Sequence, residues 1–280
     1  MKEVIKLIET HVRERRLDAH QGLNAVLDFL VDIFDVRHYL TENGWFEAVS
    51  KAEKEEPYLY KVMLIWMDKV ATSMENGSWL DFFGGVYEEM YQSRGKASTL
   101  GQFFTPPHLC TLMSRITKPN DGTINDCACG SGRTLLAAGA EAKFSRSNYY
   151  VGEDLDLVSV KMCALNLMIH GCKGRVVQHD TIMNPICYDY GFRINDIRFP
   201  IPTPFYSLTR IRFTKDDLDK ANQKIKNRCG DNVYVNKYVH EEVLTKADKG
   251  VYPISTNQTF QKEEVSNERY SKPIQLDLFG

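Results

Sequence analysis

Apolar residues recur at three- and four-residue steps through the first third of the chain, which is the period of an α-helix. One such face is formed by Leu23, Val26, Leu27, Leu30, Val31 and Phe34. A second helix is predicted from Pro57, a good first-turn residue, to Asn76-Gly77, and a third from Trp79 to about Tyr91. We therefore expect a helical domain over residues 1–95.

The pattern changes near Gly95, where short strand-like runs begin to alternate with helical stretches. The runs are Thr123–Asn125, Tyr149–Val151 and Arg175–Gln178, and the helical stretches are about 131–143 and 156–170. This order is typical of a parallel, doubly wound α/β sheet, which binds ligands at the carboxyl ends of its strands. We assign this core to residues 96–210. Residues 211–280 are expected to form a polar helical or extended tail, with a helix over Lys215–Asn227.

Composition excludes several classes of protein. The 280 residues hold 35 Lys and Arg against 37 Asp and Glu, a formal charge of −2, so the chain does not coat nucleic acid through bulk charge. No apolar run approaches the roughly 18 residues of a membrane span, and the charged N-terminus is not a secretory signal. Seven irregularly spaced cysteines, with no paired C-x-x-C framework, indicate a cytoplasmic protein with buried thiols and no zinc site.

The sharpest motif is Asp126-Cys-Ala-Cys-Gly-Ser-Gly132, between the first strand and its helix. Gly130 and Gly132 allow a tight turn and close approach of a ligand, and the helix that follows offers free N–H groups. The Asp126 carboxylate disfavours a phosphate and favours a cationic amino-acid group. The motif therefore points to S-adenosylmethionine rather than to a dinucleotide. A glycine turn without any ligand stays open as an alternative.

Acidic residues follow the next two strands. Asp154 is placed to accept hydrogen bonds from ribose hydroxyls, while Asp156 suits the N-cap of the next helix. Asp180, after the third strand, is a candidate acceptor for an adenine amino group, or an ordinary loop residue. Ahead of the turn, Gly101-Gln-Phe-Phe-Thr-Pro106 offers two aromatic rings for a cofactor or for the core, and Thr105 is expected to cap a helix that Pro106 starts.

Together these motifs resemble the modification subunit of type I restriction systems and its relatives, the adenine-N6 DNA methyltransferases. Asp81-Phe-Phe-Gly-Gly-Val-Tyr-Glu-Glu-Met is similar to that family's approach to its catalytic domain, and Gly101–Pro106 to its G-x-F-[FY]-T-P motif. Asp126–Gly132 is similar to its D-P-A-C-G-S-G loop, with Cys127 in place of Pro. Gly152–Asp156, Lys161–Asn166 and His170-Gly171 resemble its following stretch.

The resemblance implies a helical domain ahead of a Rossmann-like methyltransferase core that uses S-adenosylmethionine and methylates DNA. The cofactor-binding residues expected from the motifs and the resemblance are Phe103, Phe104, Thr105, Asp126, Cys127, Gly130, Gly132, Asp154 and Asp180. Partners expected on the same ground are DNA and a specificity subunit. Residues 207–230, with seven Lys and Arg against three Asp, could contact phosphates or form a solvated helix.

The chain departs from the family at its catalytic tetrapeptide, [DNS]-P-P-[FYW], which orients and stacks a flipped adenine. The candidate here is Thr203-Pro204-Phe205-Tyr206, in which Thr lacks the planar acceptor of Asn. We therefore expect the second half of the core to be truncated. Two functions stay open: adenine methylation, and cofactor or DNA binding without catalysis.

The C-terminal Gln275-Leu-Asp-Leu-Phe279 resembles the peptide with which bacterial DNA-maintenance proteins dock on the sliding clamp. Leu276, Leu278 and Phe279 would then fill an apolar pocket on the clamp. The alternative is that these side chains fold onto the protein's own core.

Overall fold

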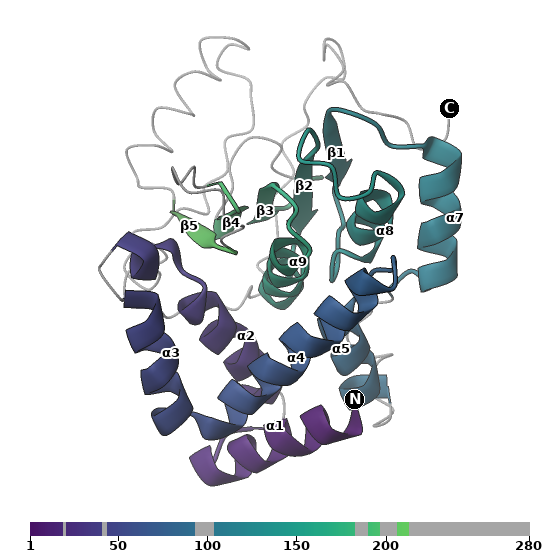
Figure 1. Ribbon diagram of the computed structural model, residues 1–280. Coiled ribbons are helices and arrows are strands. Elements are labelled where there is room, and N and C mark those ends of the chain that lie inside the picture. Colours follow the sequence, from purple (N-terminus) through teal and green to yellow (C-terminus); the bar gives the residue numbers. More distant parts are fainter. Residues whose placement is uncertain (19–20, 41–43, 93–103, 183–189, 197–205, 213–280) are drawn as a thin grey trace, which may run out of the picture. The chain divides into compact units, whose positions relative to one another are not determined.

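The computed structural model describes residues 1–18, 21–40, 44–92, 104–182, 190–196 and 206–212. Its helices are α1 (Lys2–Arg15), α2 (Gln21–Ile33), η1 (Val36–Leu40), α3 (Gly44–Glu55), α4 (Pro57–Glu75), α5 (Phe82–Gln92), α7 (Pro107–Thr117), α8 (Arg133–Glu141) and α9 (Leu157–Ile169) (Figure 1). Residues 1–181 and 190–211 form one compact unit, and a second unit of residues 182–189 and 212–280 lies almost wholly outside the described ranges. None of the described helices is long and apolar enough to cross a lipid bilayer.

The helices predicted in the first third of the chain are confirmed. α4 begins at Pro57, as expected, and ends just before Asn76-Gly77. An aromatic cluster joins α4 and α5 to the residue after α2: the Trp66 ring lies 5.9 Å from that of Phe34 and 5.2 Å from that of Phe83. All three rings are buried, so this cluster supplies much of the apolar burial that holds the three helices together.

The strands are β1 (Thr123–Asp126), β2 (Tyr149–Asp154), β3 (Gly174–Gln178), β4 (Tyr190–Ile194) and β5 (Leu208–Arg212), in the order β1-β2-β3-β4-β5. β1, β2 and β3 are parallel, as predicted, and lie within three residues of the predicted ranges. β4, however, pairs antiparallel with β3, so the expectation of an all-parallel sheet is wrong. The structure is a mixed five-stranded α/β sheet.

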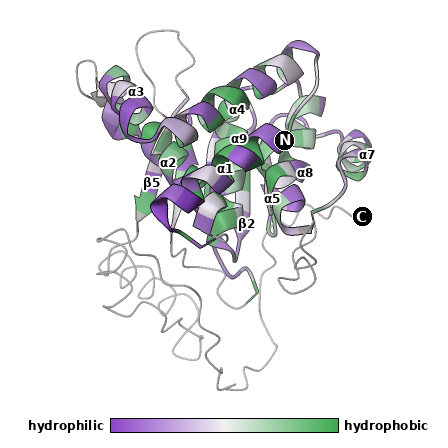
Figure 2. Cartoon of the chain, turned by 90° about the horizontal axis from the view of Figure 1, so that it is seen from below, coloured by the Kyte–Doolittle hydropathy of each residue, from purple (hydrophilic) through white to green (hydrophobic). Residues whose placement is uncertain are grey.

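The crossover helices α8 and α9 pack against each other and against the first strands (Figure 1). α9 is buried from Ser159 to Ile169, where it packs against the helices α2, α5 and α8, labelled around it in Figure 2, and against β2, β3 and β4. Its Lys161 is almost fully buried and reaches α2, where the ammonium group lies 2.5 Å from the Asp28 carboxylate and 2.8 Å from the Asn24 amide oxygen. This polar contact fixes the helical layer against the core of the sheet.

The last two strands follow the three strands that the sequence predicted, and the sequence analysis identified neither of them. β5 joins the helical segment directly: Leu208 donates its N–H to the Phe34 carbonyl at 2.8 Å, and Arg210 donates to the buried Asp35 carboxylate at 3.1 Å. The helix predicted over 215–227 lies outside the described residues.

Candidate functional site

A tight turn over residues 127–132, here called the glycine turn, connects β1 to α8. Gly130 and Gly132 both have left-handed backbone angles, with φ of +53° and +86°. A Cβ on Gly132 would lie 2.8 Å from the Cys163 sulfur and 3.3 Å from its Cα, so only glycine fits there without displacement of α9. No side chain caps α8, whose N-cap is Gly132. The turn therefore presents backbone N–H groups at a helix N-terminus.

Asp126 ends β1 on one side of this turn. One carboxylate oxygen accepts the Ala128 N–H at 3.1 Å, and the other accepts the Thr134 hydroxyl. Asp126 is half-buried, whereas Cys127 and Ala128 are exposed. The carboxylate is thus fixed in orientation next to a surface that solvent can reach.

Asp154 ends β2 on the other side of the turn. One of its oxygens accepts the Gly130 N–H at 2.8 Å and the other accepts the Asp156 N–H at 2.9 Å. Burial raises the pKa of Asp154 and the charges of Asp156 and Asp126 raise it further, while the two backbone donors oppose this shift. Each oxygen still has a lone pair available, so the carboxylate is oriented without being saturated.

Asp156 caps α9, as the sequence predicted. Its carboxylate accepts the Ser159 N–H at 2.9 Å and the Ser159 hydroxyl at 3.1 Å. The two aspartates that flank Leu155 therefore have different environments: Asp154 faces the glycine turn and Asp156 faces its own helix.

The segment after β3 is held at the same end of the sheet. His179 donates its N–H to the Asp154 carbonyl at 2.9 Å, and its ring lies 3.1 Å from the Glu153 carboxylate. Thr181 donates its hydroxyl to the Cys127 carbonyl at 3.4 Å. These contacts place half-buried Asp180 beside the glycine turn, so the ends of all three parallel strands contribute an acidic residue there.

Phe104 packs directly on the glycine turn. Its ring carbons lie 3.0 Å from the position that a Cβ on Gly130 would take, and the ring makes an edge contact with Tyr87. The Arg133 guanidinium lies over the same ring, 5.4 Å from its centroid. Phe103 lies outside the described residues.

The expected capping role of Thr105 is wrong. α7 begins at Pro107, its N-cap is Pro106, and no side chain caps it. The Thr105 carbonyl instead accepts a hydrogen bond from Arg133 at 3.2 Å. Thr105 therefore connects the segment before α7 to the start of α8.

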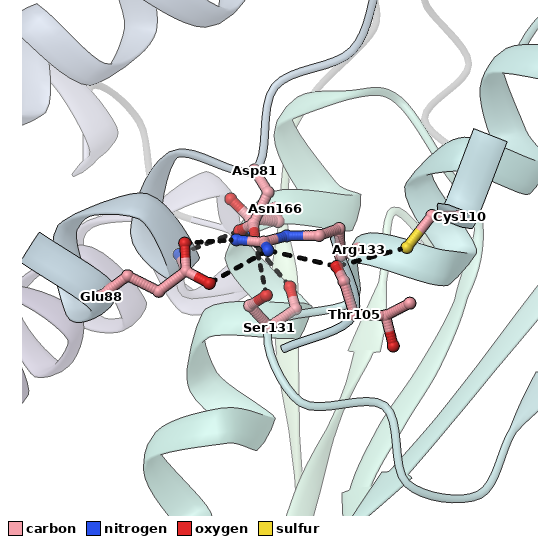
Figure 3. Close-up of polar contacts among 8 residues, drawn as sticks. Asp81, Glu88, Thr105, Cys110, Ser131, Arg133 and Asn166 are labelled. Carbon is pink, nitrogen blue, oxygen red and sulfur yellow. Dashed lines mark hydrogen bonds and ion pairs between the residues drawn. The ribbon is translucent and has the colours of Figure 1, made fainter. Parts of the chain in front are cut away.

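A buried polar cluster behind the turn was not recognised from the sequence as functional (Figure 3). Its centre is the ion pair between Asp81 and Arg133, 2.8 Å apart, with side chains only 3% and 6% exposed. Arg133 also lies 3.1 Å from Glu88. Burial opposes the charge of Arg133, but the hydrogen bonds and charges of Glu88 and Asp81 outweigh it and raise the pKa of this guanidinium. The cluster thus joins the start of α5 to the glycine turn, two segments that are about 50 residues apart in the sequence.

The thiols near the turn are parts of the core. Cys129 and Cys163 are buried, and a Cβ on Gly152 would lie 3.1 Å from each sulfur. Contact with Cys163 and burial raise the pKa of Cys129, and burial raises that of Cys163, so neither thiol is an activated nucleophile. Among the described residues, no three His, Cys, Asp or Glu side chains gather as a metal site.

The catalytic candidates are not brought to this site by the described residues. Thr203, Pro204 and Phe205 lie outside the described ranges. Tyr206 precedes β5, and β5 and β1 are at opposite ends of the strand order. Four strand spacings of about 4.8 Å therefore separate β5 from the strand that leads into the glycine turn.

Comparison with known proteins gives matches to part of the chain. The chain is 36% identical over 102 residues to the type I restriction enzyme MpnII methylase subunit of Mycoplasma pneumoniae. This match covers 32% of this chain and 18% of that protein. It is 29% identical over 124 residues to the type I restriction enzyme MjaIX methylase subunit of Methanocaldococcus jannaschii. This match covers 39% of this chain and 22% of that protein. The chain thus matches about a fifth of the length of these curated relatives.

A solved structure, the type I restriction-modification system methyltransferase subunit from Streptococcus thermophilus, aligns with 67% of this chain and 62% of its own, at 14% identity and a TM-score of 0.32. The sequence match has clearer bounds. Residues 79–193 fit the model of the N-6 DNA Methylase family, and they run from just before α5 to β4. This segment, which contains the glycine turn and the acidic strand ends around it, matches the N-6 DNA Methylase family.

Proposed function

We propose that the glycine turn binds S-adenosylmethionine and that the protein serves methylation of adenine N6 in DNA. Asp126 and the turn would hold the cationic methionine end, Asp154 the ribose hydroxyls and Asp180 the adenine amino group. Phe104 would give the cofactor an apolar contact. The observation that carries this proposal is the convergence of Asp126 and Asp154 on one turn that has no side chains at Gly130 and Gly132.

The residues present fit this cofactor. Both Asp154 oxygens already accept one N–H, which fixes the carboxylate plane and leaves lone pairs for two hydroxyl donors. The acidic ends of β1 and β2 favour a cation and disfavour a phosphate group. When bound, S-adenosylmethionine supplies an electrophilic methyl group. The residues of this chain would bind and orient it and would keep its charged end next to carboxylates.

One observation favours the second candidate function, a binding module that does not catalyse transfer alone. Tyr206, which belongs to the proposed base-binding tetrapeptide, lies beside β5 and not beside the glycine turn. In that case the chain would hold the cofactor, and groups outside the described residues would orient the adenine.

A partner subunit is part of this proposal, and α7 offers a surface for it. Leu109, Leu112 and Ile116 lie along one side of this helix and are 42%, 53% and 71% exposed. The buried side of α7 holds only the small residues Cys110 and Ser114. An exposed apolar stripe of this kind is typical of an interaction site. Co-purification with a type I specificity subunit should be lost in the double variant L112E/I116E, and co-purification that persists would contradict this use of α7.

Docking on a sliding clamp through Gln275, Leu276, Leu278 and Phe279 stays a prediction, because the tail lies outside the described residues. The double variant L278A/F279A should weaken binding to a purified clamp. Absence of any binding by the unaltered protein would eliminate the idea.

The test of the proposed function is titration calorimetry of the full chain with S-adenosylmethionine, followed by transfer of radiolabelled methyl groups to DNA of varied sequence. Asp154→Ala should lower the affinity by about tenfold or more, because a carboxylate that receives two hydroxyls is lost. Asp121→Asn is the matched control, since exposed Asp121 precedes β1 and accepts a hydrogen bond from the Ser147 hydroxyl. Binding without transfer would favour the binding module, and no binding would refute both forms of the proposal.

A further inference from the structure

The carboxylate of Asp81 receives hydrogen bonds from three separate parts of the chain. One oxygen accepts the Gly84 N–H at 2.9 Å, within the first turn of α5, and the Asn166 amide at 2.7 Å, from α9. The other accepts the Ser131 hydroxyl at 2.6 Å and the Arg133 Nε at 2.8 Å (Figure 3). All four contacts are charge-assisted and buried, so this one side chain joins α5, α9 and the glycine turn.

Asp81 and its partner Asn166 both bind Ser131, which belongs to the glycine turn. Ser131 lies between Gly130 and Gly132, the two residues with left-handed angles, and glycines have little conformational preference of their own. The Ser131 hydroxyl donates to the Asp81 carboxylate, and the Ser131 backbone carbonyl accepts a hydrogen bond from the Asn166 amide at 2.9 Å. The conformation of the turn is therefore set from outside the turn.

The approach of α5 to the turn is too close for any side chain at position 84. A Cβ on Gly84 would lie 2.0 Å from an Asp81 oxygen and 2.6 Å from the Ser131 oxygen. The Asp-x-x-Gly spacing at the start of α5 thus lets Asp81 cap its own helix and reach Ser131 with the same carboxylate.

Stability alone is a weak explanation for this arrangement. Burying the Asp81–Arg133 pair removes two charges from water, and an apolar pair of similar size often stabilises a core at least as well. What the pair provides that apolar residues do not is a directional constraint on Ser131, which lies within the turn, and on Arg133, which begins α8.

We propose that Asp81 is a positioning residue for the ligand-binding turn, which it holds through Ser131 and Arg133 in the conformation that receives the cofactor. This inference rests on the proposed function, since it assigns a role in the same site. It also gives the start of α5 a function, because Asp81, which caps this helix, holds the glycine turn.

The test compares two buried aspartates that both pair with arginine. Asp81→Asn removes the charge of the carboxylate that binds Ser131 and Arg133. Asp35→Asn does the same to an equally buried carboxylate whose partners, Arg37 and Arg210, are away from the turn. Three quantities are measured on the full chain: thermal unfolding, affinity for S-adenosylmethionine, and the NMR amide shifts of Gly130, Ser131 and Gly132 without ligand. Ser131→Ala, which removes a single hydroxyl, provides a milder variant if Asp81→Asn does not fold.

Asp81→Asn or Ser131→Ala should move the three turn amides in the ligand-free protein and lower the cofactor affinity by about tenfold. Asp35→Asn should leave the turn amides in place and the affinity within about twofold, although it destabilises the protein. Unmoved turn amides and unchanged affinity in the Asp81 and Ser131 variants would overturn the role of Asp81. If the unaltered protein binds no cofactor, the proposed function fails, and the ligand-free amide shifts still decide whether Asp81 sets the turn.

Discussion

Gly130 donates its backbone N–H to the Asp154 carboxylate at 2.8 Å, which connects the turn after β1 to the end of β2. The same carboxylate is held on its other oxygen by Asp156 N–H, so its plane is fixed before any ligand arrives. Pre-orientation of this kind lowers the entropy cost of binding. It also makes ligand binding depend on the ionisation of Asp154.

Acidification should weaken cofactor binding at pH values where an ordinary carboxylate is still ionised. The raised pKa of Asp154 means that it takes up a proton at higher pH than usual, and the protonated group loses acceptor capacity for the ribose. Calorimetry from about pH 8 to about pH 5 should show affinity falling as the pH falls. In Asp154→Ala this part of the pH dependence should vanish, and a dependence that persists there would assign it to another group.

Asp154 and Asp156 should separate into a ligand-binding and a structural role. Asp156→Ala removes the N-cap of α9 and should cost about 1 kcal/mol of stability, measured by urea unfolding. Its cofactor affinity should stay within about twofold of the unaltered protein, in contrast to Asp154→Ala. The opposite pattern would exchange the two assignments.

Alanine at Gly132 should destabilise the protein more than alanine at Gly77. Both glycines have positive φ, so both variants strain the backbone by about 1 kcal/mol. Gly77 has open space around it, whereas a Cβ on Gly132 meets Cys163, so Gly132→Ala carries a further cost of about 1–3 kcal/mol. The double variant G132A/C163A should recover part of this extra loss in urea unfolding. Equal losses at the two glycines would show that α9 yields to the new methyl group.

Stability should fall on the acid side because of His170. Burial lowers the pKa of His170 to about 4, while the ordinary value is 6.5. Its Nε2 accepts the Leu80 N–H at 3.3 Å and its Nδ1 lies 2.7 Å from the Asn166 carbonyl, so the folded protein holds the neutral ring.

The unfolded chain binds a proton below pH 6.5 and the folded chain does not until about pH 4, so stability present above pH 6.5 is lost between these values. The loss is about 3 kcal/mol. The free energy of unfolding in urea, plotted against pH across this range, should have a slope that is smaller by up to one proton in His170→Gln. The other buried histidines, His11 and His179, stay in place in this variant. An unaltered slope would exclude His170 as its source.

The sequence predicted the elements that form locally. Periodicity found α2, α4 and the strand–helix alternation from β1 to β3, and the position of Asp156 identified the cap of α9. These features depend on near neighbours in the chain. Thr105 failed as a cap because two prolines follow it, and the helix starts one residue later, after Pro106.

Contacts between segments far apart in the chain were harder to predict from the sequence. Tyr190, Phe192 and Ile194 alternate as expected for a strand, a signal that could have identified β4, but its antiparallel direction depends on a connection that the apolar pattern does not specify. The role of Asp81 depends on Arg133, 52 residues later, and on Asn166. A lone Asp-x-x-Gly does not reveal such partners, so the cluster behind the turn required the fold.

The most direct test of the central claim is an amide NMR titration of the full chain with S-adenosylmethionine. The account predicts saturable shifts that are largest at Gly130, Ser131 and Gly132, with further shifts at Asp154 and Asp180. Saturable binding that leaves these amides unmoved, or no binding at all, would contradict the assignment of the glycine turn as the cofactor site.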